Sequence, residues 1–334
     1  MRAAIIDTPG KVRVGTVDDP TPGPQEVVVK VGACGVCGTD LHIADGEFPP
    51  TPYPIVPGHE FAGEIVAVGG EVRDVREGQR AAIDPSLYCG YCEFCRRGHG
   101  NLCEHWNAIG DTVNGAFAEY VAVPAANVYP LPDEVGFREA ALIEPISCAV
   151  HGMHRLAPQS GDTFLIAGAG TMGLILLQLA LRGGASRVAM LDLNEHRLQT
   201  ARTLGAAATS TDLRELREAE PLGWDCAIDA TGVPGVIELV FDSVKRGGKM
   251  MVFGVAPGDA KVSLSPFRIY NDEITVLGSM AILYSFGAAI DLLRGGAVNA
   301  GALLTHTLEL ERFPEALHAV RRGEGVKVQV LPNG

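Results

Sequence analysis

The first 130 residues consist of short apolar runs, rich in β-branched side chains, separated by Gly and Pro. Six of these runs have the length and composition of strands: RAAIID, KVRVGTV, EVVVKVGACG, FAGEIVAVG, QRAAID and AEYVAVP. Short strands bounded by turn residues at this spacing are typical of β-sandwiches and β-barrels. The pattern therefore predicts a compact, barrel-like β domain in this part of the chain.

The pattern changes near residue 150, where stretches with helical periodicity begin to follow the apolar runs. TFLIAGAG predicts a buried strand that enters a Gly-rich turn, and TMGLILLQLALRGG predicts the helix after it, with Gly as its stop. Further strands, with the helix NEHRLQTARTLGA and other helical stretches between some of them, are predicted at RVAMLD, WDCAIDATG, KMMVFGV and ITVLGSM. Strands that alternate with helices indicate βαβ units and a doubly wound parallel sheet, so the fold class is α/β.

Two further segments bear on how the chain is organised. After about residue 282, SFGAAIDLLRGG and ERFPEALHAVRRG predict amphipathic helices, and VKVQVLP predicts a final strand. Earlier, FPPTPYPIVPG (48–58) holds five prolines and can be neither helix nor central strand. An exposed loop would not need such stiffness, so we expect a rigid connector that delivers His59 and Glu60 to a fixed place.

Composition excludes several functional classes. The net charge is −13 and is spread along the chain without a Lys/Arg-rich tract, which argues against a nucleic-acid or anionic-membrane surface. The first residues, MRAAIIDTPG, predict a strand and not a signal peptide, and the apolar runs are too short to cross a bilayer. We therefore expect a cytoplasmic protein, in which the eight cysteines serve as metal ligands more readily than as disulfides.

The strongest single motif is a four-cysteine run, Cys89-x2-Cys92-x2-Cys95-x7-Cys103. Four thiolates within fifteen residues suit a tetrahedral zinc site. Because all four positions would be filled, this zinc would hold a loop in shape and bind no substrate. An iron–sulfur cluster is the alternative, but the two-cluster ferredoxin run has a shorter last gap followed by Pro.

A Gly-rich turn lies between the strand TFLIA and the following helix, where a dinucleotide pyrophosphate would bind at the helix N-terminus. The residues expected there are Gly168, Gly170, Thr171, Met172 and Gly173. Asp192, nineteen residues past Gly173, ends the next strand. Its carboxylate would accept hydrogen bonds from the adenosine ribose and repel the 2′-phosphate of NADP, which only Arg197 could offset, so NAD is favoured. The ends of later strands are expected to line the cofactor crevice at Thr231, Gly232, Phe253 and Val255.

Residues 34–60, CGVCGTDLHIADGEFPPTPYPIVPGHE, concentrate ligand-type and proton-transfer side chains. A zinc ion held by Cys37, His59 and a carboxylate would keep one position open for an alcohol or carbonyl oxygen. Thr39 could pass on the proton of a bound alcohol, and His42 could release it to solvent. Hydride would go to or from a nicotinamide bound on the other domain.

Simpler roles exist for the same residues. Cys34-x2-Cys37 could be a redox pair, although it does not open the helix of a thioredoxin-like unit. A lone His42 in a loop would be incidental, and Asp40 could cap a turn or support a metal-bound histidine. Three cysteines are expected to be small buried apolar residues: Cys34, Cys148 and Cys226.

Four motifs occur together and in order: Cys37-Gly-Thr-Asp-Leu-His42, Gly58-His-Glu-x2-Gly63-x5-Gly69-x2-Val72, the four-cysteine run and the Gly168–Gly173 turn. In this combination the chain resembles the zinc-dependent medium-chain alcohol dehydrogenase family over essentially its whole length. Within that family it is most similar to the polyol (sorbitol-like) and threonine dehydrogenase branch, because of Glu144-Pro145 in ALIEPISCAVHG.

The resemblance implies a domain organisation and an assembly. A GroES-like, β-rich catalytic domain would comprise residues 1–148 and 282–334, with a Rossmann NAD-binding domain over residues 149–281. Each chain would hold two zinc ions, one catalytic and one structural. Relatives are dimers or tetramers, so a homo-oligomer is expected.

The resemblance also assigns roles to residues of the motifs. Cys37 and His59 would be ligands of the catalytic zinc, and Asp40 would support His59. Thr39 would contact the substrate oxygen, and His42 would end a proton relay through the cofactor ribose.

The third protein ligand stays open between two carboxylates. Alcohol dehydrogenases proper have a Cys where this chain has Glu144, and Cys148 stands four residues late. In the polyol branch Glu60 would bind directly, with Glu144 close by, whereas in other relatives the later carboxylate is the ligand. Glu60 is favoured, and exchange of the two carboxylates as substrate enters is the remaining alternative.

The function predicted is NAD-dependent oxidation of a secondary alcohol, a polyol or sugar-like alcohol, to a ketone. A threonine 3-dehydrogenase is the first alternative, and it would need a group that recognises the substrate carboxylate. A non-enzymatic zinc- or nucleotide-binding protein is the second, but such a protein would need no proton relay. A zinc-free quinone reductase relative is disfavoured by the two metal motifs.

Overall fold

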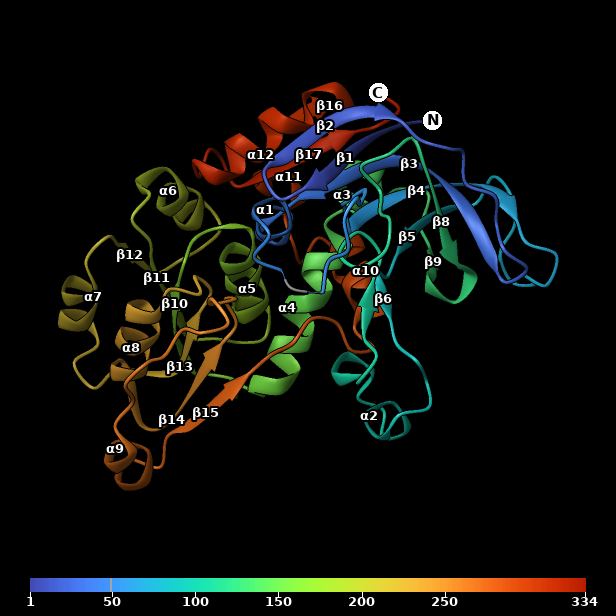
Figure 1. Cartoon of the computed structure of the whole chain (residues 1–334). Coiled ribbons are helices and arrows are strands. Elements are labelled where there is room, and N and C mark those ends of the chain that lie inside the picture. The colour runs from blue at the N-terminus through green and yellow to red at the C-terminus, as the bar shows by residue number, and fades with distance from the viewer. Residues whose placement is uncertain (49) are drawn as a thin grey trace. The chain divides into compact units, whose positions relative to one another are not determined.

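The computed structural model describes residues 1–48 and 50–334, which form two compact units (Figure 1). The first unit comprises Met1–Ser147, Ile282–Gly295 and Leu303–Gly334, and the second comprises Cys148–Ala281 and Gly296–Ala302. Pro49, one of the five prolines of the predicted connector, lies outside the described residues. In the described part of the chain, no helix combines the length and the apolar character needed to cross a membrane.

The two units differ from the predicted domain boundaries chiefly at residues 296–302, which group with the second unit. Two hydrogen bonds to the helix α5 (Thr171–Arg182) account for this. The Asn299 N–H donates to Gln178 Oε1 at 2.7 Å, and Arg182 Nη2 donates to the Gly296 carbonyl at 3.2 Å. The partners on α5 are 121 and 114 residues away in sequence, so the pattern of apolar residues could not show these contacts.

A seven-stranded sheet forms the core of the first unit, in the order β16-β17-β3-β4-β5-β9, with β8 also paired to β3. The six runs predicted from the first 130 residues are confirmed as strands. Val27, Val29 and Val31 of β3 are fully buried and pack into one apolar core with Ile65 and Phe117. The strands of the sheet are β3 (Glu26–Val36), β4 (Glu60–Val68), β5 (Arg80–Ile83), β8 (Tyr120–Pro124), β9 (Val128–Pro130), β16 (Leu304–Glu309) and β17 (Lys327–Leu331).

The C-terminal strands belong to the same sheet as the N-terminal ones. β17 runs antiparallel to β3, with Val330 opposite Cys34, and pairs in parallel with β16 on its other side. The predicted final strand is thereby confirmed, whereas β16 carries mostly exposed side chains and gave no apolar signal. This pairing places Lys327, the first residue of β17, beside the part of β3 that precedes Cys37.

Smaller elements complete the first unit. Two short ribbons are β1 (Arg2–Thr8) with β2 (Lys11–Thr16), and β6 (Ser86–Leu87) with β7 (Asn107–Ala108). The helices are α1 (Gly38–Asp45), α2 (Glu93–Arg96), α3 (Phe137–Ala140), α10 (Phe286–Arg294) and α12 (Phe313–Arg321), and α4 (Ile143–Leu156) continues into the second unit. Three 3-10 turns lie at Gly100–Leu102, Ala125–Asn127 and Leu310–Arg312. The two amphipathic helices predicted after residue 282 are confirmed as α10 and α12.

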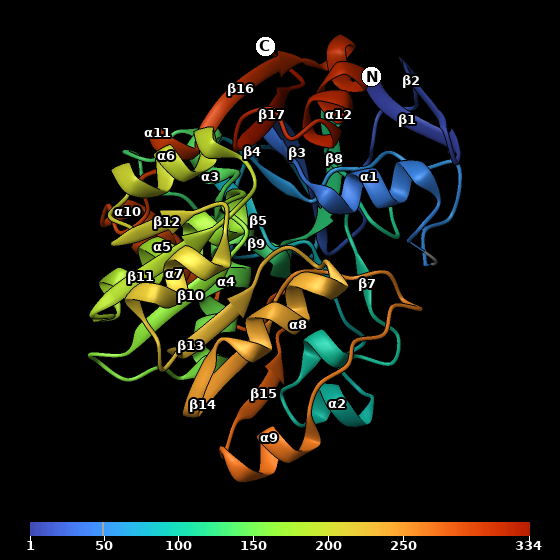
Figure 2. The ribbon, with the colours of Figure 1, turned by 90° about the vertical axis from the view of Figure 1, so that its left-hand side faces the viewer.

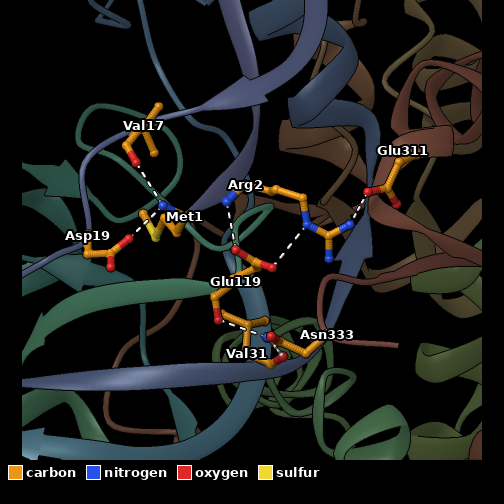
Figure 3. Close-up of polar contacts among 8 residues, drawn as sticks. All are labelled: Met1, Arg2, Val17, Asp19, Val31, Glu119, Glu311 and Asn333. Atoms are coloured by element: carbon orange, nitrogen blue, oxygen red, sulfur yellow. Dashed lines mark hydrogen bonds and ion pairs between the residues drawn. The ribbon is translucent and has the colours of Figure 1, made fainter.

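Polar contacts join the two ends of the chain to the first unit (Figure 3). Glu119 Oε2 accepts the Arg2 N–H at 2.7 Å, and the Arg2 guanidinium pairs with both Glu119 and Glu311. Asn333 Nδ2 donates to the Val31 carbonyl at 2.9 Å and to the Glu119 carbonyl at 2.8 Å. The N-terminal strand, the residue before β8 and the C-terminal tail are thus held together.

The second unit contains a six-stranded parallel sheet in the order β12-β11-β10-β13-β14-β15 (Figures 1 and 2). This order reverses between β10 and β13, as in a doubly wound dinucleotide-binding sheet. Its strands are β10 (Thr163–Ala167), β11 (Arg187–Leu191), β12 (Ala208–Ser210), β13 (Trp224–Asp229), β14 (Val244–Val252) and β15 (Thr275–Gly278). The other helices are α6 (Glu195–Thr203), α7 (Leu213–Ala219), α8 (Pro234–Asp242), α9 (Pro266–Asn271) and α11 (Ala300–Leu303).

Candidate active site and metal centres

Cys37 directly follows β3 and forms the N-cap of α1. Its Sγ accepts the Thr39 N–H at 3.3 Å, while its own N–H donates to Asp40 Oδ2 at 2.9 Å. These two bonds make a reciprocal capping box, which explains why a helix starts here. His42 therefore lies in a helix and not in a loop, and Asp40 is a helix cap.

The two ring nitrogens of His59 lie close to two different side chains. Nε2 lies 3.2 Å from Cys37 Sγ, and Nδ1 lies 2.9 Å from Asp111 Oδ1. Asp40, the expected supporting residue, is farther away, with Oδ1 3.9 Å from Nδ1. Asp111 is thus the nearer carboxylate, which the sequence analysis missed.

Glu60, the first residue of β4, completes a cluster of three ligand types. One ligand atom from each of Cys37, His59 and Glu60 lies within 4.8 Å of the others. A Glu60 oxygen also forms an ion pair with the Lys327 ammonium, and both side chains are at most 3% exposed. A Cβ at position 35 would overlap this same Glu60 oxygen, so a side chain there would displace the carboxylate.

The cluster fits a single small metal ion. A tetrahedral ion with bonds of about 2.3 Å to sulfur and about 2.0–2.1 Å to nitrogen holds those two atoms about 3.6 Å apart. The observed Cys37–His59 separation of 3.2 Å is near that edge length. A thiolate, an imidazole and a carboxylate are all zinc ligand types, and a catalytic zinc site has three protein ligands with the fourth position open.

Burial and opposite charges shift the titration of this cluster. Burial raises the pKa of the Cys37 thiol, and it raises the pKa of Asp40 to about 6. Burial alone would lower the pKa of His59, but Asp111 and Cys37 outweigh it and hold the pKa well above its ordinary value. In the same way burial lowers the pKa of Lys327, and the facing carboxylate more than reverses this.

The other predicted residues of this region lie on α1 and α4. Thr39 is in the first turn of α1, and His42 is one turn farther on, with 40% of its side chain exposed and Nδ1 2.9 Å from Glu47 Oε2. Glu144 is half-buried in the first turn of α4. Among the described residues, it is Glu60 and not Glu144 that belongs to the ligand cluster with Cys37 and His59.

The side chains of the predicted four-cysteine run lie close together. Sγ of Cys89 lies 4.0 Å from that of Cys95, and Sγ of Cys92 lies 3.9 Å from that of Cys103. A tetrahedral ion with about 2.3 Å bonds to sulfur separates its ligands by about 3.8 Å, so these distances fit one ion. An iron–sulfur cluster would fit less well, because several iron and sulfide atoms would stand between the thiolates.

Backbone N–H groups donate hydrogen bonds to the sulfur atoms of the four-cysteine run. Cys92 N–H donates to Cys89 Sγ at 3.4 Å, and His105 N–H donates to Cys103 Sγ at 3.2 Å. Bonds of this kind from Cys95 and Glu104 lower the pKa of Cys92 to about 6. Such donors stabilise thiolates, the form that binds metal.

In the second unit the predicted Gly-rich turn joins β10 to α5. Gly168 has φ +101°, and Gly170 caps α5. A Cβ on Gly173 would overlap the Gly168 carbonyl, so the helix approaches the strand as closely as a dinucleotide site requires. Asp192 holds this turn, because its Oδ2 accepts the Ala169 N–H at 2.6 Å. Thr171 and Met172 begin α5.

Arg197, which the sequence places as the only cation able to soften the effect of Asp192, stands in the first turn of α6. Its Nη1 would lie 4.0 Å from a Cβ built on Gly170, so the guanidinium reaches the Gly-rich turn.

The later strand ends also meet in the second unit. Asp229, fully buried, accepts the N–H groups of Thr231 at 3.0 Å and of Gly232 at 3.1 Å. A Cβ on Gly232 would overlap the Val255 carbonyl, so the turn after β13 packs on the segment after β14. Phe253, half-buried, and Val255, 76% exposed, belong to that segment.

Cysteines outside the two clusters are mostly buried, as predicted. Cys34 and Cys226 are at most 1% exposed, whereas Cys148 is half-buried. All eight cysteines are free thiols, so Cys34 and Cys37 form no disulfide.

Sequence reasoning missed three residues of the site: Gly35, Asp111 and Lys327. A lysine at the start of the predicted final strand VKVQVLP was the one available signal. Its partner, Glu60, is far away in the sequence, so the pairing could not be inferred.

The first unit combines a β sheet with two clusters of potential zinc ligands, and the second is a doubly wound nucleotide-binding unit. This combination defines the class of zinc-binding dehydrogenases. The family profile for the alcohol dehydrogenase GroES-like domain matches residues 23–133, and the profile for zinc-binding dehydrogenases matches residues 171–295. The chain belongs to this zinc-binding alcohol dehydrogenase family and is an NAD(P)-dependent enzyme of it.

Individual relatives cover the whole chain. D-arabinitol dehydrogenase 1 of Uromyces fabae is 38% identical over 100% of this chain and 97% of its own length. Sorbitol dehydrogenase of Bacillus subtilis (strain 168) is 33% identical, with coverages of 100% and 98%. L-threonine 3-dehydrogenase of Rhizobium etli (strain CIAT 652) is 30% identical, with 98% of each chain covered.

Solved structures agree with the fold. A zinc-binding dehydrogenase from Sinorhizobium meliloti 1021, bound to NADP, superposes with a TM-score of 0.95 at 35% identity, with 99% of each chain covered. An alcohol dehydrogenase from E. coli CFT073, complexed with NADH, has a TM-score of 0.93 at 30% identity and the same coverage. The predicted fold class and family resemblance are confirmed.

Proposed function

We propose that this enzyme oxidises a secondary hydroxyl of a polyol or sugar alcohol to a ketone, with NAD as the acceptor and two bound zinc ions. The observation that carries this proposal is the convergence of Cys37, His59 and Glu60, three zinc ligand types that leave one position open. The relatives named for D-arabinitol and sorbitol support the substrate class.

When bound, zinc supplies a Lewis acid for the alcohol oxygen and NAD accepts the hydride. Cys37, His59 and Glu60 hold the metal. Thr39, at the start of α1, would accept the proton of the substrate hydroxyl while passing on its own hydroxyl proton. That proton would travel through the cofactor ribose to His42, on the same helix and 40% exposed, which would release a proton to solvent. The contact between His42 Nδ1 and Glu47 Oε2, 2.9 Å apart, orients the ring.

Glu60 is the proposed third ligand, because it is the carboxylate that lies with Cys37 and His59. Metal content of Glu60→Gln and Glu144→Gln variants tests this choice. Loss of one zinc is expected in the Glu60 variant only. Loss in the Glu144 variant alone would assign the ligand to α4.

The preference for NAD rests on Asp192, whose carboxylate stands beside the Gly-rich turn. Its charge would repel a 2′-phosphate, so kcat/KM should be higher with NAD than with NADP. Asp192→Asn keeps an acceptor for the Ala169 N–H but removes the charge. It should therefore lower the ratio of kcat/KM with NAD to kcat/KM with NADP. A wild-type preference for NADP would contradict the proposal and point to Arg197.

A panel of D-arabinitol, sorbitol, other polyols, L-threonine and simple alcohols, each with NAD, tests the substrate class. Polyol oxidation is expected, with activity and one of two zinc ions lost in Cys37→Ser. Threonine oxidation alone would support the alternative suggested by the threonine dehydrogenase relatives. One zinc and no dehydrogenase activity would indicate a binding protein.

We further propose a cytoplasmic homo-oligomer, a dimer or a tetramer. None of the described cysteines is in a disulfide, which fits a reducing compartment. Light scattering of the purified protein measures the assembly, and a monomeric mass would contradict it.

A further inference from the structure

We propose that Asp111 positions His59 as a metal ligand, by holding Nδ1 of the ring so that Nε2 faces Cys37. The proposal rests on the proposed function, in which His59 binds zinc. It assigns Asp111 a role that the sequence motifs give to Asp40.

The ring geometry carries the first step. A metal-bound imidazole has one nitrogen for the metal, and its orientation is set by what the other nitrogen contacts. Here Nε2 of His59 is 3.2 Å from Cys37 Sγ, so Nε2 is the atom on the ligand side. Nδ1 points the opposite way, to Asp111 Oδ1 at 2.9 Å. A carboxylate in that place also raises the basicity of the ligand nitrogen.

Asp111 is a rigid part of the fold and not a mobile surface acid. It is 7% exposed, its N–H donates to the Ala108 carbonyl at 3.2 Å, and its carbonyl accepts Thr51 Oγ1 at 2.8 Å. Hydrogen bonds therefore fix both the backbone N–H and the backbone carbonyl of Asp111.

The turn that carries Asp111 packs directly on the backbone that carries His59. Ala116 N–H donates to the Gly58 carbonyl at 2.9 Å. A Cβ on Gly110 or on Gly115 would overlap Gly58, so both positions need glycine for this contact. Close backbone packing holds the carboxylate at a set distance from the ring.

Asp40 has a different task. Its Oδ2 accepts the Cys37 N–H at 2.9 Å in the cap of α1, and its Oδ1 is 3.9 Å from His59 Nδ1. Asp40 therefore orders the residue that supplies the thiolate, and Asp111 orders the residue that supplies the imidazole.

The test compares Asp111→Ala and Asp111→Asn with Asp84→Asn, all as full-length protein loaded with zinc. Asp84 is a carboxylate of the same unit that accepts the Ser86 N–H at 2.9 Å and is a member of neither metal cluster. Competition with a chelator measures the affinity of each zinc, and the four-cysteine zinc serves as the internal reference. Cobalt substitution adds the thiolate-to-metal absorption band as a second readout.

Asp111→Ala should weaken the catalytic zinc by about 10–100-fold and change the cobalt spectrum, while the four-cysteine zinc keeps its affinity. Asp111→Asn should also weaken the catalytic zinc, because it keeps the side-chain volume but removes the negative charge that faces Nδ1. Wild-type affinity in Asp111→Ala, or an equal loss at both zinc sites, would overturn the proposal. His59→Ala separates the two hypotheses: if it keeps two zinc ions, the proposed function fails and not only the role of Asp111.

Discussion

Removal of the Lys327 charge tests how much this ammonium stabilises the buried carboxylate of Glu60. Lys327 and Glu60 form an ion pair in which the side chains are 2% and 3% exposed. Lys327→Met keeps most of the side-chain length and volume but leaves the Glu60 carboxylate buried beside Gly35 without its cation. A buried charge that loses its partner destabilises the folded state by about 3–5 kcal/mol, whereas an exposed pair contributes about 0–1 kcal/mol.

We therefore expect Lys327→Met to lower the free energy of unfolding at pH 7 by about 3–5 kcal/mol. For a domain of about 150–250 residues this corresponds to a fall in Tm of about 6–20 °C. The loss should shrink when zinc is added, because a metal ion bound by Glu60 supplies the missing positive charge. Glu60→Gln in the same chain should restore part of the stability, because it removes the unpaired carboxylate.

Urea unfolding of the two single variants and the double variant gives the coupling energy between Lys327 and Glu60. The matched control is the exposed pair of Arg294 and Glu134, 2.8 Å apart and each 57% exposed, probed by Arg294→Met. If Lys327→Met costs no more than Arg294→Met, or if the two site variants are additive, the reasoning about a buried charge pair is refuted.

Three shorter predictions follow from other parts of the chain. Gly173→Ala should weaken NAD binding more than tenfold in a fluorescence titration, because its Cβ would overlap a backbone carbonyl. Gly235→Ala is the control and should bind NAD normally, because its Cβ meets open space. Cys92→Ser should lose one zinc by metal analysis and lower Tm, and two retained zinc ions would contradict the four-thiolate site. Burial raises the pKa of Asp225, but the Lys245 ammonium and further hydrogen bonds outweigh this and lower it below the ordinary value of 3.8. Asp225→Asn should therefore destabilise the protein by about 1–2 kcal/mol at pH 7, measured by urea unfolding, and the difference should disappear as the pH falls below that value. A difference that persisted at low pH would exclude the charge as its cause.

Local patterns predicted much of the fold. The all-buried strand β10, the Gly-rich turn after it and the apolar helix α5 were visible because each is contiguous in sequence. The edge strand β16 was not, because most of its side chains are exposed and carry no alternation. The helix α1 was also missed, since a cysteine N-cap is an unusual start signal.

The amino-acid sequence by itself determined the chemistry available to this protein: a four-thiolate run, a dinucleotide turn, and a Cys–His–Glu set near a stiff connector. Tertiary structure decided which of these groups meet. It brought Glu60 together with Cys37 and His59, and it placed Asp111 behind the imidazole and Lys327 against the carboxylate. These partners come from strands and turns up to hundreds of residues apart, and their meeting depends on sheet pairing and close backbone packing, which no local pattern encodes.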